Sequence, residues 1–240
     1  MDKTNPTMEP KLPLRARKKA KVREALIQTS FRLFSERGYT ETTLEQICEE
    51  CDVTVQTLLR YFGSKDDLLF AKHPAIIERF HSGLVLATQR KASLEYWIKF
   101  LHSNARRVRD EREVRDSYKI IVGAPSLLAR FYAIGRQYAA LLEQALLEEN
   151  GLQADQDMHS TLLANAIVMG PLEEALRALS QNKAAEVVER TDTAAKYVME
   201  NFKRPERRDE IRTSGQKEKG PPAQLRGAHD SVDRLGRAST

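Results

Sequence analysis

The 240-residue chain contains only two cysteines, Cys48 and Cys51, so a framework of disulfide bonds cannot hold its fold together. Its five histidines are scattered, and no second cysteine pair or histidine pair follows at a zinc-binding spacing. The sequence also lacks a phosphate-binding glycine loop, a nucleophile elbow and a motif that pairs catalytic carboxylates. These absences do not exclude an enzyme, but the sequence proposes no catalytic residue, no metal ligand and no cofactor.

Long apolar runs are missing as well. No segment approaches the roughly 18 apolar residues that a membrane-spanning helix needs. The first residues do not contain the apolar core of a signal peptide. We therefore expect a cytoplasmic protein with no membrane partner. The chain is long enough to bury one sizeable core plus a small head domain.

Positive charge is concentrated at the two ends of the chain. The formal net charge is +5, and every charged residue between Lys11 and Arg23 is basic. Acidic and basic residues balance between Ala71 and Phe202, and basic residues are again in excess from Lys203 onward. A basic segment of this kind suits a nucleic-acid partner, although a solvated basic arm is the alternative.

The stretch from Thr42 to Lys65 has the pattern of two short helices joined by a tight turn. Thr43 and Gln46 have the spacing of a capping box at the start of the first helix. Asp52 tolerates the left-handed backbone conformation that a sharp turn requires. Thr54 can cap the second helix. This order of elements predicts a helix-turn-helix.

The second of these helices has two different sides. Its inner side would be formed by Leu58, Tyr61 and Phe62. Its outer side would carry Val55, Gln56, Thr57 and Arg60. An exposed helix with an amide, a hydroxyl, a short apolar group and a guanidinium suits the edges of base pairs in a DNA major groove.

Residues 31–47 (FRLFSERGYTETTLEQI) and 58–69 (LLRYFGSKDDLL) resemble the DNA-binding domain of the TetR family of transcriptional regulators. The similarity runs without a gap from about Lys19 to Phe70. The sequence departs from the family at two positions. Asp52 stands where the family usually has glycine, and Leu59 stands where a tyrosine usually contacts a phosphate. The resemblance therefore implies one phosphate contact fewer than usual.

The resemblance implies a homodimer that binds a palindromic double-stranded DNA operator, most often as a repressor. The two recognition helices would enter successive major grooves about 34–36 Å apart. Base contacts are expected from Val55, Gln56, Thr57 and Arg60. Phosphate contacts are expected from Thr42, Thr43, Thr54, Tyr61, Lys65 and Lys19, with Lys18 and Lys21 nearby.

The domain organisation follows from the helical pattern and the resemblance together. We predict an all-α protein with a flexible arm (1–16), a three-helix helix-turn-helix DNA-binding domain (17–70), a larger helical ligand-binding and dimerisation domain (71–202) and a disordered tail (203–240). His73-Pro74 predicts a break between the two domains. The last two helices, about 155–179 and 184–202, would pair with their symmetry mates, although their periodicity fits an intramolecular core equally well.

The larger domain is expected to bind a hydrophobic small molecule. Residues 115–131 resemble a subgroup typified by the mycofactocin regulator, which implies a long-chain acyl-CoA as effector. The acyl chain would then lie among Trp97, Leu101, Ile121, Leu128, Phe131 and Tyr138. Arg106, Arg107 or Arg109 would bind an anionic ligand at the mouth of the pocket. The alternative is that the apolar residues fill the helical core and the arginines lie on a solvated face.

Two further alternatives stay open at this point. The Cys48-x-x-Cys51 pair fits small buried thiols, with a redox switch as the alternative hypothesis. The whole chain could also be a helical small-molecule-binding protein or enzyme with a vestigial head, or an adaptor that uses the helix-turn-helix to bind another protein. A polar recognition face beside a basic arm favours the DNA-binding regulator over both.

Overall fold

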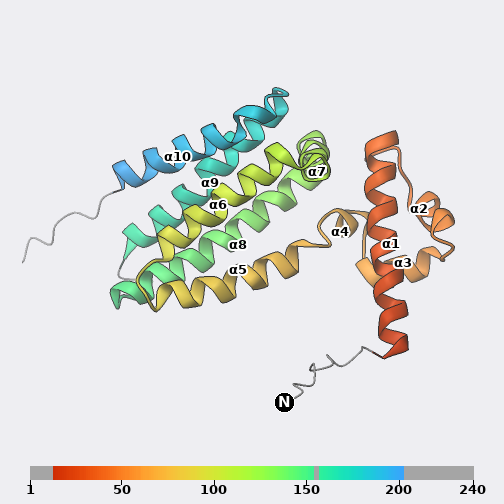
Figure 1. The fold of residues 1–240 in the computed structure, drawn as a ribbon, viewed down its shortest axis with the longest axis horizontal. Helices are drawn as coiled ribbons and strands as arrows, with labels where there is room; N and C mark the ends of the chain where they lie inside the picture. The colour runs from red at the N-terminus through yellow and green to blue at the C-terminus, as the bar shows by residue number, and fades with distance from the viewer. Residues whose placement is uncertain (1–12, 154–156, 203–240) are drawn as a thin grey trace, which may run out of the picture. The chain divides into compact units, whose positions relative to one another are not determined.

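The computed structural model describes residues 13–153 and 157–202, which all belong to one compact unit, Met1–Lys203. Every regular element in these ranges is helical, which confirms the predicted all-α class (Figure 1). Most of the predicted arm and all of the predicted tail lie outside the described residues. None of the helices in the described ranges combines the length and apolar character needed to cross a membrane.

The helices fall into two groups that we call the head and the body. The head consists of α1 (Leu14–Arg37), α2 (Leu44–Glu50), α3 (Val55–Phe62) and α4 (Lys65–Leu69). The body consists of α5 (His73–Thr88), α6 (Ser93–Asp110), α7 (Arg112–Gly123), α8 (Pro125–Asn150), α9 (Met158–Ser180), the 3-10 turn η2 (Ala184–Glu186) and α10 (Val187–Asn201).

Helix α1 begins at Leu14, within the segment predicted as a flexible arm (1–16), and Pro13 stands at its N-cap. A proline does not disturb a helix start, since the N–H that it lacks would have no helical acceptor there. The helix buries one stripe of residues that includes Leu26, Ile27 and Phe34. It ends at Arg37, before Gly38 with φ 90°.

The predicted break at His73-Pro74 is confirmed. Helix α4 ends at Leu69, a short turn follows, and α5 starts at His73 with Pro74 in its first turn. Ser93 is the first residue of α6, its backbone N–H donates to Glu149 Oε1 at 2.8 Å, and its hydroxyl bonds to Thr88 Oγ1 at 3.0 Å.

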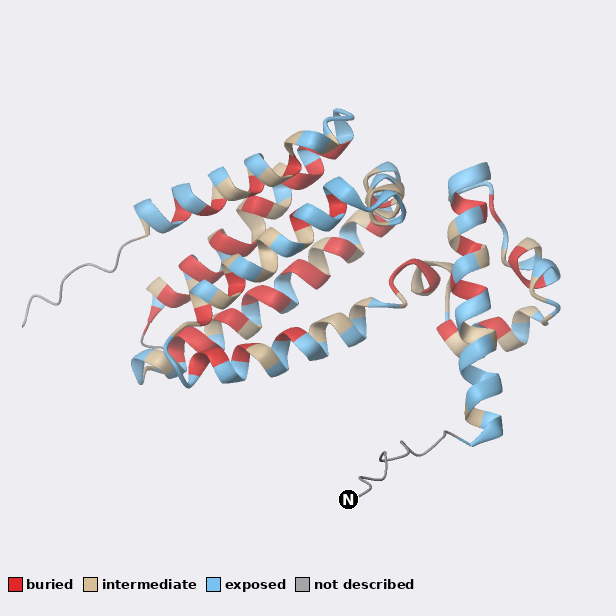
Figure 2. Ribbon diagram, in the orientation of Figure 1, coloured by how far each residue is buried: buried red, intermediate tan, exposed pale blue. Residues whose placement is uncertain are grey.

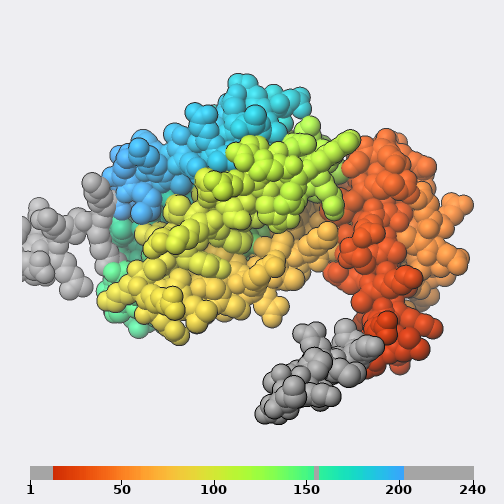
Figure 3. Space-filling model, in the orientation of Figure 1, coloured from red at the N-terminus to blue at the C-terminus, as the bar shows by residue number. Residues whose placement is uncertain are grey.

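The helices of the body turn their buried faces toward one another (Figure 2). Helix α9 packs against both α8 and α10, and α6 lies beside α10 on the face that the space-filling view shows (Figure 3). Aromatic rings fill the centre: Phe80, Trp97, Phe100 and Tyr138 have ring centroids 4.7–6.0 Å apart. This packing holds the helices around the cavity described below.

Candidate nucleic-acid interface and body cavity

The first helix of the helix-turn-helix is capped as predicted. The Thr43 hydroxyl accepts the Gln46 backbone N–H at 3.3 Å, and Gln46 Oε1 accepts the Thr43 backbone N–H at 3.0 Å. The turn that follows places Asp52 at φ 52°, which is the left-handed conformation that the sequence predicted. Backbone bonds from Asp52 to Glu49 and from Val53 to Cys48 close this turn. The start of α3 is therefore set by local bonds alone.

Helix α3 is capped by Thr54, whose hydroxyl accepts the Thr57 backbone N–H at 3.1 Å. Leu58 and Phe62 are buried beneath it, which fixes the side that faces outward. Gln56 and Arg60 are exposed on the outer side.

The other residues of the predicted recognition face are less exposed to solvent. Val55 is half-buried and packs against the core, and Thr57 is half-buried with its hydroxyl 2.9 Å from that of Thr54. Leu59 is 40% exposed and stands on the same outer side. The exposed part of the face thus consists mainly of Gln56, Leu59 and Arg60.

Thr42 does not belong to a phosphate-binding surface, and this prediction was wrong. Its side chain is fully buried, and its hydroxyl donates to the carbonyl oxygens of Gly38 at 2.8 Å and Leu33 at 3.3 Å. The residue ties the loop between α1 and α2 to the end of α1. Thr43, at the start of α2, is exposed, and Tyr61, in α3, is half-buried.

Lys65 has a structural role that the sequence did not reveal. Its ammonium donates to the backbone carbonyls of Tyr39 at 2.8 Å and Thr42 at 3.0 Å, and it lies 4.2 Å from the centroid of the Tyr39 ring. Burial lowers the pKa of Lys65 below its ordinary value. Only one of the three ammonium donors is left for a phosphate. The residue primarily holds the α1–α2 loop against the start of α4.

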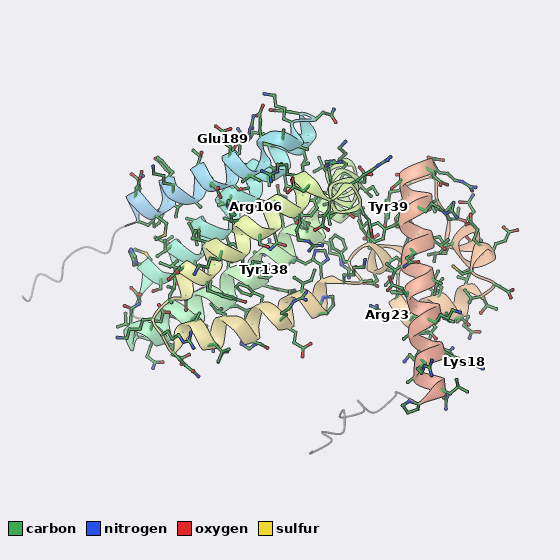
Figure 4. All side chains as sticks on the ribbon, viewed as in Figure 1. Lys18, Arg23, Tyr39, Arg106, Tyr138 and Glu189 are labelled. Carbon is green, nitrogen blue, oxygen red and sulfur yellow. The ribbon has the colours of Figure 1, made fainter. Side chains whose placement is uncertain are left out.

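Basic residues line the first turns of α1. Lys18, Lys19 and Lys21 are exposed there, and Figure 4 shows Lys18 near the helix start. Lys19 Nζ lies 5.8 Å from the centroid of the Tyr61 ring, which brings this positive charge to the end of α3. Among the residues that the structure describes, no carboxylate pairs with these three lysines. Three positive charges at the start of α1 are therefore exposed to solvent.

Two arginines connect the head to neighbouring elements. Arg23 of α1 donates to the carbonyl oxygen of Ala71 at 2.9 Å and lies 5.2 Å from the Phe62 ring centroid. Arg130 of α8 pairs with Asp67 of α4 and lies 5.1 Å from the Phe70 ring centroid. The Arg130–Asp67 pair thus joins the body to the last helix of the head.

The pKa of Asp67 lies below its ordinary value. Burial opposes this shift, but hydrogen bonds from Ser64 and Arg130 outweigh it. The Ser64 hydroxyl donates to Asp67 Oδ2 at 2.7 Å, and the same hydroxyl accepts the Asp67 backbone N–H at 3.2 Å. Asp67 is therefore ionised at neutral pH and pairs with Arg130 in its charged form.

The body encloses a cavity of about 330 Å³. Five of the six residues predicted to bind a ligand line it, namely Trp97, Leu101, Ile121, Phe131 and Tyr138. Leu128, the sixth, is not part of the lining and packs against the core instead. Phe31 of α1 and Leu69 of α4 also line the cavity, so it reaches the head.

The arginines predicted to bind an anion are differently placed. Arg107 lines the cavity, but its guanidinium makes two bonds to Glu111, at 2.9 and 3.1 Å. Arg109 pairs with Asp110 and does not line the cavity. Arg106 lines a separate, open hollow between α6 and α10. Arg107 is therefore the one arginine of this segment that lines the cavity, and its charge is already paired with Glu111.

Both cysteines are free thiols. Cys48 is buried in the core of the head, and burial raises the pKa of its thiol. Cys51 is half-buried at the end of α2. A thiol with a raised pKa is a poor nucleophile. In the ranges that the structure covers, no group of three potential ligands could hold a metal ion.

Part of the chain matches a family of bacterial regulatory proteins, and its relatives include transcriptional regulators. Residues 26–71 match the family described as "Bacterial regulatory proteins, tetR family". The HTH-type transcriptional regulator TcmR of Streptomyces glaucescens is 29% identical over 151 residues, which cover 60% of this chain and 67% of TcmR. The HTH-type transcriptional regulator HbdR of Aromatoleum sp. (strain CIB) is 38% identical over 58 residues, which cover 24% of this chain and 25% of HbdR.

Solved structures extend the likeness from the head to the body. A complex of SmeT with triclosan has a TM-score of 0.58 at 16% identity and covers 78% of this chain and 96% of SmeT. FadR of Thermus thermophilus in complex with lauroyl-CoA has a TM-score of 0.56 at 18% identity and covers 78% of this chain and 97% of FadR. At these identities the likeness establishes a shared fold and nothing about the ligand.

Proposed function

We propose, from the premise that the chain belongs to the TetR family of bacterial regulatory proteins, that it is a ligand-responsive transcriptional repressor. It would bind a palindromic operator as a homodimer and leave it when a small molecule occupies the body. Chromosomal DNA as partner implies action in the cytoplasm. No enzymatic step is part of this function.

The proposal rests on the polar side chains that are exposed on the outer side of α3. Gln56 and Arg60 are exposed on a helix that Thr54 caps at its start and whose other side, with Leu58 and Phe62, is buried in the core. A glutamine amide can make paired hydrogen bonds to adenine, and an arginine can do so to guanine. The lysines at the start of α1 lie beside this helix and would bind phosphates without regard to sequence. An enzyme or a scavenger with a vestigial head would need neither feature.

The dimer is proposed to form through α9 and α10. Four large apolar side chains are exposed on these helices: Met158 (74%), Leu162 (49%), Tyr197 (66%) and Met199 (39%). Exposed apolar groups gathered on neighbouring helices are typical of a surface that pairs with another chain. Two copies would bring two α3 helices to one face of the DNA.

Release from the operator is proposed to start in the cavity. Its lining joins residues of α5–α10 to Phe31 and Leu69 of the head. A ligand that prefers a body conformation with differently spaced heads lowers operator affinity by the ratio of its affinities for the two conformations. The effector would be a hydrophobic small molecule. An acyl-CoA is the less favoured candidate, because Arg107 at the cavity is already bonded to Glu111.

A gel-shift titration of the full-length protein against the DNA that flanks its own coding region tests the proposal. Specific retention of a palindromic fragment, with a salt-dependent dissociation constant, is the expected result. The head variant Gln56→Ala serves as the matched control, since it alters the outer side of α3 without touching its buried side. Failure to retain any duplex fragment, together with a monomer at micromolar concentration in sedimentation, would rule the proposal out.

A further inference from the structure

The cavity is walled by aromatic rings from several helices. The rings of Trp97, Phe100 and Tyr138 lie against one another, with centroids 5.5–6.0 Å apart. Tyr118 and Phe131 form a second pair, 5.2 Å apart at an interplanar angle of 77°. Figure 4 labels Tyr138 inside the body. Walls of this kind favour a flat ring system that can stack or meet them edge to face.

The acidic and basic side chains that line the cavity form ion pairs with one another. Arg107 makes two bonds to Glu111, and Lys72 Nζ lies 3.5 Å from Glu113 Oε1. A ligand anion would have to displace a carboxylate from one of these pairs, and a ligand cation would have to displace a basic group. Since a charge taken from water needs a partner, the lining favours an uncharged ligand.

Three residues of this lining carry a neutral polar group that has no hydrogen-bond partner in the described part of the chain. Within the described ranges, no hydrogen bond reaches the hydroxyls of Tyr118 and Tyr138. The buried Nδ1 of His73 has no partner at hydrogen-bonding geometry. Burial raises the pKa of Tyr118 to about 12 and also raises that of Tyr138, so both remain phenols. Burial and the nearby Arg130 lower the pKa of His73 to about 4 against the opposing effect of the Phe70 backbone, so its imidazole is uncharged at pH 7. Neutral phenols and an imidazole can both donate and accept hydrogen bonds.

We infer that the cavity binds an uncharged, hydroxylated aromatic compound, with its rings against Trp97 and Phe131 and its hydroxyl groups bonded to Tyr118, Tyr138 and His73. The inference rests on the proposed function, because it names the class of effector for the same cavity. The volume of about 330 Å³ lies at the small end of ligand sites, roughly 300–1,000 Å³. It suits a fused-ring compound rather than an acyl-CoA.

The position of His73 gives such a ligand access to the joint between head and body. His73 is the first residue of α5, and its ring lies 5.2 Å from that of Phe70 and 6.4 Å from that of Phe131. Phe70 directly follows α4 and lies against Arg130, which pairs with Asp67. A ligand hydroxyl bonded to His73 therefore acts on the residues that connect the cavity to the last helix of the head.

A matched series of naphthalenes tests the inference by calorimetric titration of the full-length protein. The series consists of 2,7-dihydroxynaphthalene, naphthalene-2-sulfonate and 2-methylnaphthalene, which share one ring system and differ in charge and hydrogen bonding. We expect the diol to bind at least about tenfold more tightly than either of the others, which is the gain from a hydrogen bond or two. Tighter binding of the sulfonate, or equal binding of the methyl compound, would overturn the inference.

Two variants separate the hydrogen bonds from the packing. Tyr118→Phe should weaken diol binding about five- to tenfold and leave the affinity for 2-methylnaphthalene within about twofold. Tyr132→Phe on α8, whose hydroxyl donates to Glu173 at an exposed position and does not line the cavity, should change neither affinity. If Tyr118→Phe weakened both ligands equally, the hydroxyl would have no role in recognition. Operator binding without ligand is measured separately, so a protein that binds DNA but ignores the diol would refute this inference and leave the proposed function intact.

Discussion

The indole Nε1–H of Trp97 in α6 donates a hydrogen bond to the backbone carbonyl of Ile167 in α9, 3.0 Å away in the buried core. In an uninterrupted helix this carbonyl would accept the N–H of the residue four positions later. That residue is Pro171, which has no N–H. Trp97 thus supplies the donor that the proline removes, and the same indole forms part of the cavity wall.

This relationship predicts that the effect of losing the indole depends on residue 171. Trp97→Phe should lower the free energy of unfolding by about 1–3 kcal/mol beyond its loss of packing, because a buried carbonyl loses its donor. In a Pro171→Ala background the helix can supply its own N–H, so the same substitution should cost about 1 kcal/mol less. Urea unfolding of the four proteins measures the difference. Equal costs in the two backgrounds would contradict this explanation of the bond.

Lys65 and Lys19 are predicted to affect DNA binding in different ways. Lys65→Met removes the donor to two loop carbonyls and should lower the stability of the protein by about 1–3 kcal/mol. Lys19→Met removes an exposed charge, so stability should hold while the slope of log affinity against log salt falls by about 0.9 for each subunit, or about 1.8 for the dimer. Thermal unfolding and gel shifts at several salt concentrations check both. A Lys65→Met protein with unchanged stability would show that the two bonds from Lys65 to the loop carbonyls do not stabilise the fold.

Gln56 is predicted to read sequence rather than to add general affinity. Gln56→Ala should cost about 1–3 kcal/mol for each half-site of the natural operator and relax the preference at one base pair of each half-site. Its effect on stability should be small, because the side chain is exposed. Competition binding with single-base operator variants measures the preference. A uniform loss of affinity for all sequences would instead indicate that Gln56 contacts phosphates.

Local sequence chemistry was sufficient to predict the helix-turn-helix. The capping box of Thr43 and Gln46, the turn at Asp52 and the cap at Thr54 depend on residues within a few positions of one another, so spacing predicted them correctly. The roles of Thr42 and Lys65 depend on which loop folds over them. Their polar side chains look free in the sequence, but the α1–α2 loop uses both.

The body cavity was predictable only in part for a similar reason. Apolar periodicity marks residues that point inward, but it does not separate those that line a cavity from those that fill the core. Leu128 satisfied the pattern but is half-buried and packs against the core, whereas His73, Tyr118 and Phe31 line the cavity and belong to no single stripe. Their convergence comes from the packing of different helices, which a pattern along one helix does not contain.

The Arg130–Asp67 pair is predicted to contribute measurably to the link between body and head. Both side chains are partly buried, and Asp67 also accepts a hydrogen bond from the Ser64 hydroxyl. A double-mutant cycle with Arg130→Gln and Asp67→Asn should give a coupling energy of about 1 kcal/mol. The exposed Lys99–Glu95 pair on α6 is the control, and its coupling should be about 0.3–0.5 kcal/mol. Equal couplings would mean that the head–body pair behaves as an ordinary surface pair.

His73 should make the protein less stable in mild acid. Its pKa is about 4 in the folded protein, because burial and the charge of Arg130 disfavour the imidazolium, and the ordinary value is 6.5. Between these two values the unfolded chain binds the proton more readily, so the free energy of unfolding falls as pH is lowered through that window. The full shift corresponds to roughly 3 kcal/mol, and most of it should appear between pH 6.5 and pH 4.

Comparison with a His73→Gln variant isolates this contribution from the other titrating groups. The variant has no imidazole to protonate, so its urea midpoint should fall less than that of the parent protein between pH 7 and pH 4.5. His81→Gln, on the exposed side of α5, is the control and should follow the parent. The same decline in all three proteins would mean that His73 is readily protonated in the folded state, in which case it could not offer the cavity a neutral nitrogen.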